Sequence, residues 1–187
     1  MEKILRNKYF HMYVKIIGIT ITITITITIT IIIICSVEVL FINVTYGNVL
    51  NVQWLNKKLG SFGEYGAILA ASSWFLRHIW LFLKKKNMHG FKIIKELYLF
   101  IKRFHILIGY TVIAVAATHG VYFLIKGSRH IILIYSGIFS LLTLIALGVA
   151  GFGLQKSNQK TKLKMYRKVH QFIGVLFGIG LLIHLIV

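Results

Sequence analysis

Long apolar runs separated by short polar or basic stretches form the main pattern of this chain. Each run has about 20 residues or more, which is the length of helix that crosses the hydrocarbon core of a bilayer. We therefore predict an all-α fold, an integral membrane helical bundle that forms a single transmembrane domain over residues 16–187. A basic tail over residues 1–15 precedes it. The five predicted transmembrane helices cover residues 16–42, 62–83, 105–125, 131–154 and 169–187.

The first run contains six consecutive Ile-Thr dipeptides, from Ile19 to Thr30. Strict alternation is typical of a strand, including the strands of outer-membrane barrels. A single strand cannot satisfy its backbone in lipid, whereas a helix can, and a threonine hydroxyl can bond to a carbonyl one turn earlier. We therefore predict a helix. It resembles a signal peptide, but its long core and the lack of a small-residue cleavage site favour a retained anchor.

Two connecting segments carry further signals. Residues 43–61 are polar and rich in turn-forming residues such as Asn43 and Asn56, so we expect a loop there. Residues 84–103 are strongly basic, but apolar side chains recur at helical spacing from Phe91 to Ile101. That combination predicts an amphipathic helix lying on the membrane surface.

The composition supports the membrane assignment: 57% of the residues are hydrophobic and the formal net charge is +18. The basic residues cluster between apolar runs, which argues against nucleic acid and for membrane topology, with membrane lipid as a partner. Of the 22 Lys and Arg residues, most lie on one predicted side. The other side holds only Lys57, Lys58, Lys126 and Arg129. The positive-inside rule then predicts a multi-pass protein of the cytoplasmic membrane, with a cytoplasmic N-terminus and an external C-terminus.

Two of the predicted helices each carry a pair of histidines fourteen residues apart: His105 with His119, and His170 with His184. Fourteen residues return to within about 40° of the same helix face and rise about 21 Å. Because the two helices run in the same direction, adjacent placement gives an inner and an outer level, each with two imidazoles. Two imidazoles fill both axial positions of a haem iron, so we predict two b-type haems. The alternative is that these histidines are interfacial or packing residues without a ligand.

Small residues accompany the histidines. Gly109 follows His105 by four residues, and Gly174 follows His170 by four. Residues four apart share a face, so these glycines remove side chains where a flat macrocycle must approach the backbone. Gly180, four residues before His184, is expected to do the same at the outer level.

Cationic side chains lie beside the inner histidines. Arg103 and Arg167 are close in sequence to His105 and His170, where they are candidates to pair with haem propionates. Arg77 and His78, near the far end of the second predicted helix, are candidates for contact with a propionate, a quinone or a partner, against simple snorkelling to the interface.

From Lys102 to its end, the chain resembles the ferric reductase-like transmembrane family, in which two helices each bear two histidines at this spacing. The family includes the haem-binding membrane subunit of the bacterial methionine sulfoxide reductase system. The resemblance implies that His105 and His170 bind the inner haem and that His119 and His184 bind the outer one. It also implies electron transfer from a cytoplasmic flavoprotein or quinol to an external redox partner.

The chain departs from that family in two ways. Family members commonly have six transmembrane helices, and many continue into a flavin and nicotinamide domain, whereas five helices are predicted here and no such domain. We therefore expect an oxidoreductase membrane component and predict no catalytic residue. Two other functions stay open: a quinol-oxidising cytochrome b subunit of a larger complex, and a haem-free membrane assembly or transport protein.

Overall fold

The computed structural model describes residues 2–46, 52–88, 90–127 and 130–187, and these ranges contain five α-helices. All five are long and apolar enough to cross a membrane, so the predicted all-α bundle of five membrane helices is confirmed in the described part of the chain. The helices are α1 (Glu2–Tyr46), α2 (Gln53–Lys85), α3 (Phe91–Lys126), α4 (Ile131–Lys156) and α5 (Lys160–Ile186).

Several helices extend well beyond the apolar runs that predicted them. α1 includes most of the basic tail, α2 begins at Gln53 rather than near residue 62, and α5 begins at Lys160 rather than Val169. The sequence contains no proline, so nothing in it forces a helix to end where its polarity changes. Hydropathy identified the apolar segments that match the length of the hydrocarbon core. It did not identify the residues at which each helix begins and ends.

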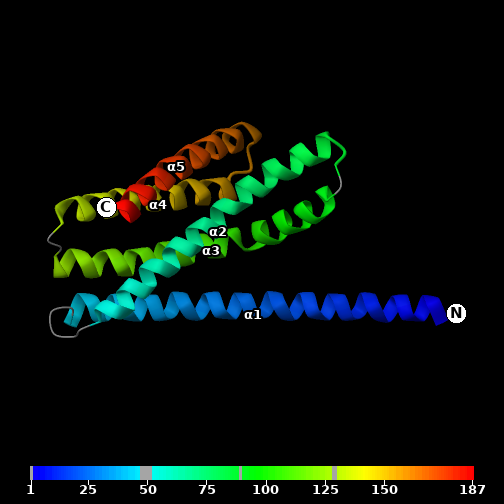
Figure 1. Ribbon diagram of the computed structural model, residues 1–187, viewed down its shortest axis with the longest axis horizontal. Coiled ribbons are helices and arrows are strands. Elements are labelled where there is room, and N and C mark those ends of the chain that lie inside the picture. The colour runs from blue at the N-terminus through cyan, green and yellow to red at the C-terminus, as the bar shows by residue number, and fades with distance from the viewer. Residues whose placement is uncertain (1, 47–51, 89, 128–129) are drawn as a thin grey trace.

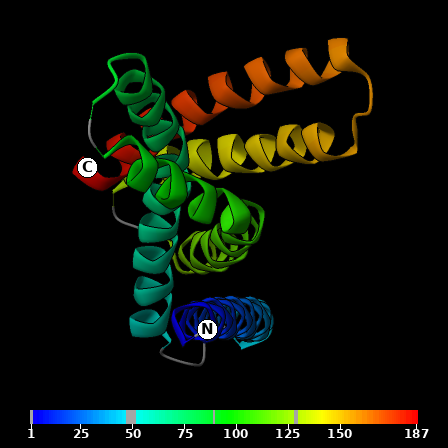
Figure 2. The same cartoon turned by 90° about the vertical axis from the view of Figure 1, so that its right-hand side faces the viewer.

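The predicted surface helix is not a separate element. Residues 91–103 are helical, but they continue without a break into the third membrane helix as the start of α3. Figures 1 and 2 show that α3 changes direction along its length. The basic connector and the histidine-bearing segment are therefore parts of one helix.

The Ile-Thr repeat is helical, as predicted. Every threonine hydroxyl from Thr20 to Thr30 donates to the carbonyl four residues earlier, at 2.8–3.0 Å. Each of these hydroxyls is thereby satisfied within its own helix, so the repeat leaves none of them without a partner in lipid. α1 packs mainly on α3, and its N-terminal part extends beyond the other helices (Figure 1).

The core lies on the inner face of α3. Phe104, Ile108 and Val112 are buried there at four-residue spacing, and they pack against Ala67 of α2 and Leu144 of α4. α2 packs on α3, and α4 packs on α5, while α3 and α4 join the two halves (Figures 1 and 2). α3 and α5 are not a closely packed pair of helices.

A buried polar cluster ties α1, α2 and α3 together. Asn43 and Asn56 exchange two side-chain amide hydrogen bonds, at 2.8 and 3.1 Å. The Asn43 Nδ2 also donates to the Thr118 carbonyl at 3.2 Å, and the Thr118 hydroxyl donates to the Ser36 carbonyl at 2.9 Å. All four residues are at most 1% exposed. The prediction that Asn43 and Asn56 lie in a polar loop is wrong, because both lie in helices and satisfy each other.

Replacing Asn43 by alanine is expected to destabilise the bundle by about 1–3 kcal/mol, because it leaves the buried Asn56 amide and Thr118 carbonyl without partners. The measurement is the thermal unfolding midpoint of the full chain in detergent micelles. Asn158→Ala, at an exposed position between α4 and α5, is the control and should leave the midpoint unchanged. Equal midpoints for the two variants would show that the cluster contributes nothing.

Candidate histidine site

The four predicted histidines meet in two pairs across α3 and α5. The ring centroids of His105 and His170 are 6.2 Å apart, and the ring planes are inclined by 74°. Those of His119 and His184 are 6.4 Å apart and inclined by 83°. Each pair combines one ring from α3 with one from α5, so the structure brings the histidines together at two levels.

These separations fit one metal atom between the rings of each pair. A first-row metal binds imidazole nitrogen at about 2 Å, and the ring centre lies about 1 Å behind that nitrogen. Two imidazoles on opposite sides of one metal therefore have centroids about 6 Å apart, as both pairs do. An edge-to-face aromatic contact also spans this range, so the separation alone does not distinguish the two arrangements.

The described residues contain no group of three or more His, Cys, Asp or Glu side chains that could hold a metal ion. A bare ion such as zinc needs three or four protein ligands. A haem iron receives four nitrogens from its macrocycle and takes only two axial ligands from the protein. Each histidine pair supplies two imidazoles, which is the number of protein ligands that a haem iron takes.

Neighbouring helices orient two of the rings through hydrogen bonds of the imidazole Nδ1. The Nδ1–H of His119 donates to the Asn56 carbonyl of α2 at 2.9 Å, and that of His170 donates to the Leu147 carbonyl of α4 at 3.2 Å. A carbonyl only accepts, so in these two rings Nδ1 carries a proton, and in the neutral form of each ring Nε2 then keeps its lone pair. Metal-binding histidines are commonly held in this tautomer by a backbone carbonyl.

The other two histidines have related surroundings. The Nδ1 of His184 is 3.1 Å from the Ser136 hydroxyl, and its ring lies beside the backbone of Leu133 in α4. His105 lies beside the backbone of Ala70 in α2, but its buried Nδ1 forms no hydrogen bond with the residues that the structure describes. All four histidines thus face the backbone of the preceding helix.

The backbone positions that face the histidines repeat the histidine spacing. Asn56 and Ala70 are fourteen residues apart in α2, and Leu133 and Leu147 are fourteen apart in α4. Two helix hairpins, α2–α3 and α4–α5, therefore have the same internal arrangement. In each hairpin the first helix presents two backbone sites, and the second presents two histidines.

Three glycines of α2 and α4, which the sequence interpretation missed, make room for the rings. A Cβ atom at Gly60 would lie 2.6 Å from a ring atom of His119. One at Gly137 would lie 3.1 Å from a ring atom of His184, and one at Gly151 would lie 3.4 Å from a ring atom of His170.

Each of these glycines follows by four residues a backbone position that faces one of the histidine rings. In a helix the side chain of residue i+4 lies over the turn that contains residue i, so glycine there uncovers the carbonyl of residue i. Gly60 follows Asn56 by four, and Gly151 follows Leu147 by four. The residue four after Ala70 is Trp74, and His105 is the histidine without an Nδ1 hydrogen bond.

The three predicted glycines have different surroundings. A Cβ at Gly109 would meet nothing within 4 Å, and one at Gly174 would be at ordinary contact distance, 3.7 Å, from Leu147. A Cβ at Gly180 would be 2.7 Å from the Phe139 ring of α4. The structure therefore gives Gly180 a role in packing α5 on α4, while Gly109 borders open space.

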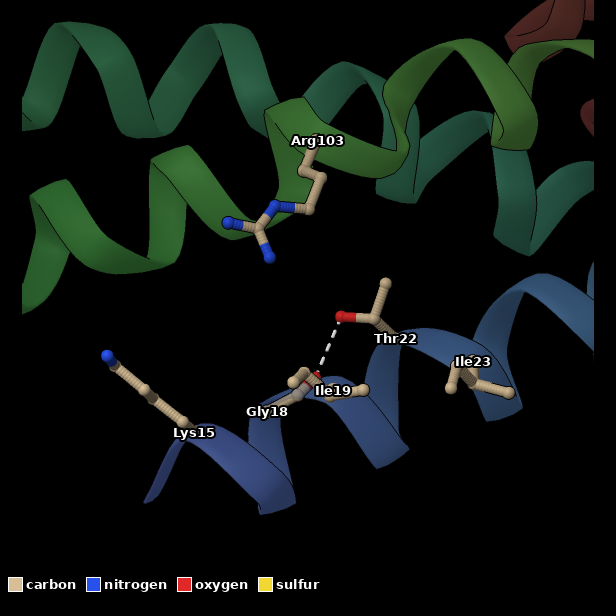
Figure 3. A pocket seen from close by; sticks show the side chains of 6 residues that line it. All are labelled: Lys15, Gly18, Ile19, Thr22, Ile23 and Arg103. Carbon is tan, nitrogen blue, oxygen red and sulfur yellow. Dashed lines mark hydrogen bonds between the residues drawn. The ribbon is translucent and has the colours of Figure 1, made fainter. Parts of the chain in front are cut away.

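The predicted cations next to the inner histidines are not alike. Arg103 extends from α3 towards α1 and lines a groove between these two helices (Figure 3). His105 follows Arg103 by two positions, which is roughly 200° around the helix, so the two side chains leave α3 on different sides. Arg167 is exposed in α5, three residues before His170.

Arg77 and His78 lie in the second half of α2. The His78 ring is exposed, and its Nδ1 is 2.8 Å from the carbonyl of Trp74 in its own helix. Arg77 is half-buried. His78 thus bonds within α2, in contrast to the four paired histidines, whose rings face another helix.

An apolar layer separates the two levels of histidines. Phe177 stands seven residues from both His170 and His184 in α5, and it packs with Leu181 against the core formed by α2, α3 and α4. The two levels are therefore separate sites rather than one polar channel.

Comparisons with known proteins add no relative to this description. No family model, no curated protein and no solved structure matches the chain. The functional interpretation therefore rests on the residues themselves.

Replacing Gly60 by alanine is expected to displace the His119 ring from the Asn56 carbonyl, since the new methyl group would lie within 3 Å of that ring. Loss of this hydrogen bond should cost about 1 kcal/mol and remove the preference for the Nδ1–H tautomer. Imidazole ¹⁵N chemical shifts in the full chain report the tautomer.

Gly178→Ala is the matched control, because a Cβ at Gly178 meets nothing within 4 Å. It should leave the His119 shifts unchanged. If Gly60→Ala also leaves them unchanged, Gly60 does not position the ring.

Proposed function

We propose that this protein is a dihaem b-type membrane cytochrome that passes electrons from one side of a membrane to the other. His105 and His170 would ligate the inner haem, and His119 and His184 the outer one. The observation that carries the proposal is that the rings of both pairs, 6.2 and 6.4 Å apart, have the separation of two axial ligands on one iron.

The surroundings of the rings support a haem over a simple aromatic contact. Neutral imidazoles with Nδ1 bonded to a backbone carbonyl present the Nε2 lone pair that a haem iron binds. α3 and α5, which carry the ligands, are not closely packed on each other, and Gly109 borders open space. A flat macrocycle needs space between the two helices that carry its ligands, and it needs room to approach their backbone.

Bound haem would supply reversible one-electron transfer between ferric and ferrous iron, with no axial position left open for oxygen or substrate. The residues of this chain hold the two centres at fixed levels and keep the layer between them apolar through Phe177 and Leu181. The fourteen residues between ligands in one helix correspond to about 21 Å, most of the thickness of the hydrocarbon core. Two centres at these levels provide a path between the two faces of the membrane.

The distribution of charge supports an orientation. The N-terminal tail, the end of α2 with the start of α3, and the end of α4 with the start of α5 carry most of the 22 Lys and Arg residues, which favours a cytoplasmic location for that end of the bundle. His105 and His170 then form the cytoplasmic level. A cytoplasmic flavoprotein or a quinol would donate electrons there, and an external redox partner would accept them from the level of His119 and His184.

The test is the number of haems per chain in histidine variants of the full protein, purified after expression with haem supply and measured by extraction and by reduced-minus-oxidised spectra. The protein should hold two b-type haems. His119→Ala and His184→Ala should each hold one, and combining them should cause no further loss. Combining His119→Ala with His105→Ala should remove both haems.

His78→Ala is the control, because His78 bonds within its own helix, and it should keep two haems. A parent protein without haem would contradict the proposal. So would a result in which His105 and His119, rather than His119 and His184, behave as one unit.

A further inference from the structure

A groove between α1 and α3 lies apart from the histidine pairs. Its volume is about 390 Å³. α1 contributes five of its lining residues and α3 one (Figure 3). The lining residues are Lys15, Gly18, Ile19, Thr22, Ile23 and Arg103.

The floor of the groove is apolar. Ile19 and Ile23 line it, and the Thr22 hydroxyl donates to the Gly18 carbonyl at 2.8 Å within α1 (Figure 3). The Thr22 hydroxyl therefore donates its only hydrogen within α1. A Cβ at Gly18 would meet nothing within 4 Å, so the groove is widened where this side chain is missing.

Two cationic side chains, Lys15 and Arg103, line the groove. Figure 3 shows that Arg103 extends from α3 and Lys15 from α1 into the space between the two helices. None of the lining residues is acidic, and the whole chain has only four acidic residues. Among the residues that the structure describes, no acidic side chain lines the groove to neutralise these two charges.

The groove also has a defined level in the membrane. Lys15 is the last Lys or Arg before the apolar run of α1, and Ile19 and Ile23 follow one and two turns further into that run. Arg103 is likewise the last Lys or Arg before the apolar run of α3. The cations thus lie at the bilayer boundary, and the apolar floor leads into the hydrocarbon. A ligand that fits must be anionic at one end and apolar along the other.

We propose that this groove is a binding site for one anionic phospholipid. Its headgroup phosphate pairs with Arg103 and Lys15, and an acyl chain lies along Gly18, Ile19 and Ile23. Basic pockets between membrane helices bind anionic headgroups in this way, and Arg suits a phosphate because its planar fork forms two parallel hydrogen bonds. The bound lipid fills the space between α1 and α3 at this end. This site uses none of the four paired histidines and does not depend on haem.

The test is lipid binding to the purified full chain in detergent, titrated with phosphatidylglycerol or with phosphatidylcholine of the same acyl chains and followed by native mass spectrometry. The protein should retain phosphatidylglycerol preferentially. The double variant Lys15→Gln/Arg103→Gln should bind it about tenfold more weakly or worse, since each cation contributes to headgroup attraction.

Two further variants separate the groove from general surface charge. Lys92→Gln/Lys95→Gln removes the same charge from exposed positions of α3 outside the groove and should bind phosphatidylglycerol like the parent. Gly18→Leu keeps every charge and extends a side chain from a position where the Cβ meets nothing within 4 Å, so it should occupy the groove and weaken binding. Far-ultraviolet circular dichroism verifies that each variant is folded.

Equal weakening in the two double variants would overturn the proposal in favour of diffuse attraction. Parent-like binding by Gly18→Leu, or no preference of the parent protein for phosphatidylglycerol, would also overturn it. The haem content of these variants should equal that of the parent, so the lipid proposal and the haem proposal fail separately.

Discussion

A histidine inside a membrane bundle can bond to a backbone carbonyl of another helix only where that carbonyl is accessible, and most of this structure follows from that constraint. Helical carbonyls already accept one hydrogen bond and are covered by the side chain four residues further on. Gly60 and Gly151 remove that cover, so His119 and His170 reach the carbonyls of Asn56 and Leu147. The ring orientation is thus set by the absence of side chains on the facing helix.

This constraint explains why the bundle is built from two similar hairpins. In α2–α3 and in α4–α5, the first helix presents two backbone positions fourteen residues apart, and the second carries two histidines with the same spacing. Hydrogen bonds within the hairpins orient His119, His170 and His184, and the two hairpins place the four rings opposite one another across α3 and α5. The Asn43–Asn56 pair adds α1 to the first hairpin, because Asn56 bonds to Asn43 through its side chain and to His119 through its carbonyl.

The sequence predicted the five helices and the meeting of the two histidine pairs, but it missed other contacts between neighbouring helices. Apolar length predicted five helices, and the fourteen-residue interval predicted that His105 and His119 share a face. Asn43 and Asn56 looked like loop residues, because an isolated amide in lipid is unfavourable and only the folded structure shows that the two amides satisfy each other. Gly60 could have been found only by pairing α2 with α3. Arg103 was assigned to the inner histidines from its place in the sequence, whereas it extends towards α1 (Figure 3).

The central claim is that each level holds one iron between two imidazoles, and electron paramagnetic resonance of the oxidised, purified full chain tests it most directly. Axial imidazoles make ferric haem low-spin, and ring planes inclined by 74° and 83° make its signal strongly anisotropic. The account predicts two such low-spin centres per chain and no high-spin ferric haem. A high-spin ferric signal in the intact protein, or the absence of any haem signal, would contradict it.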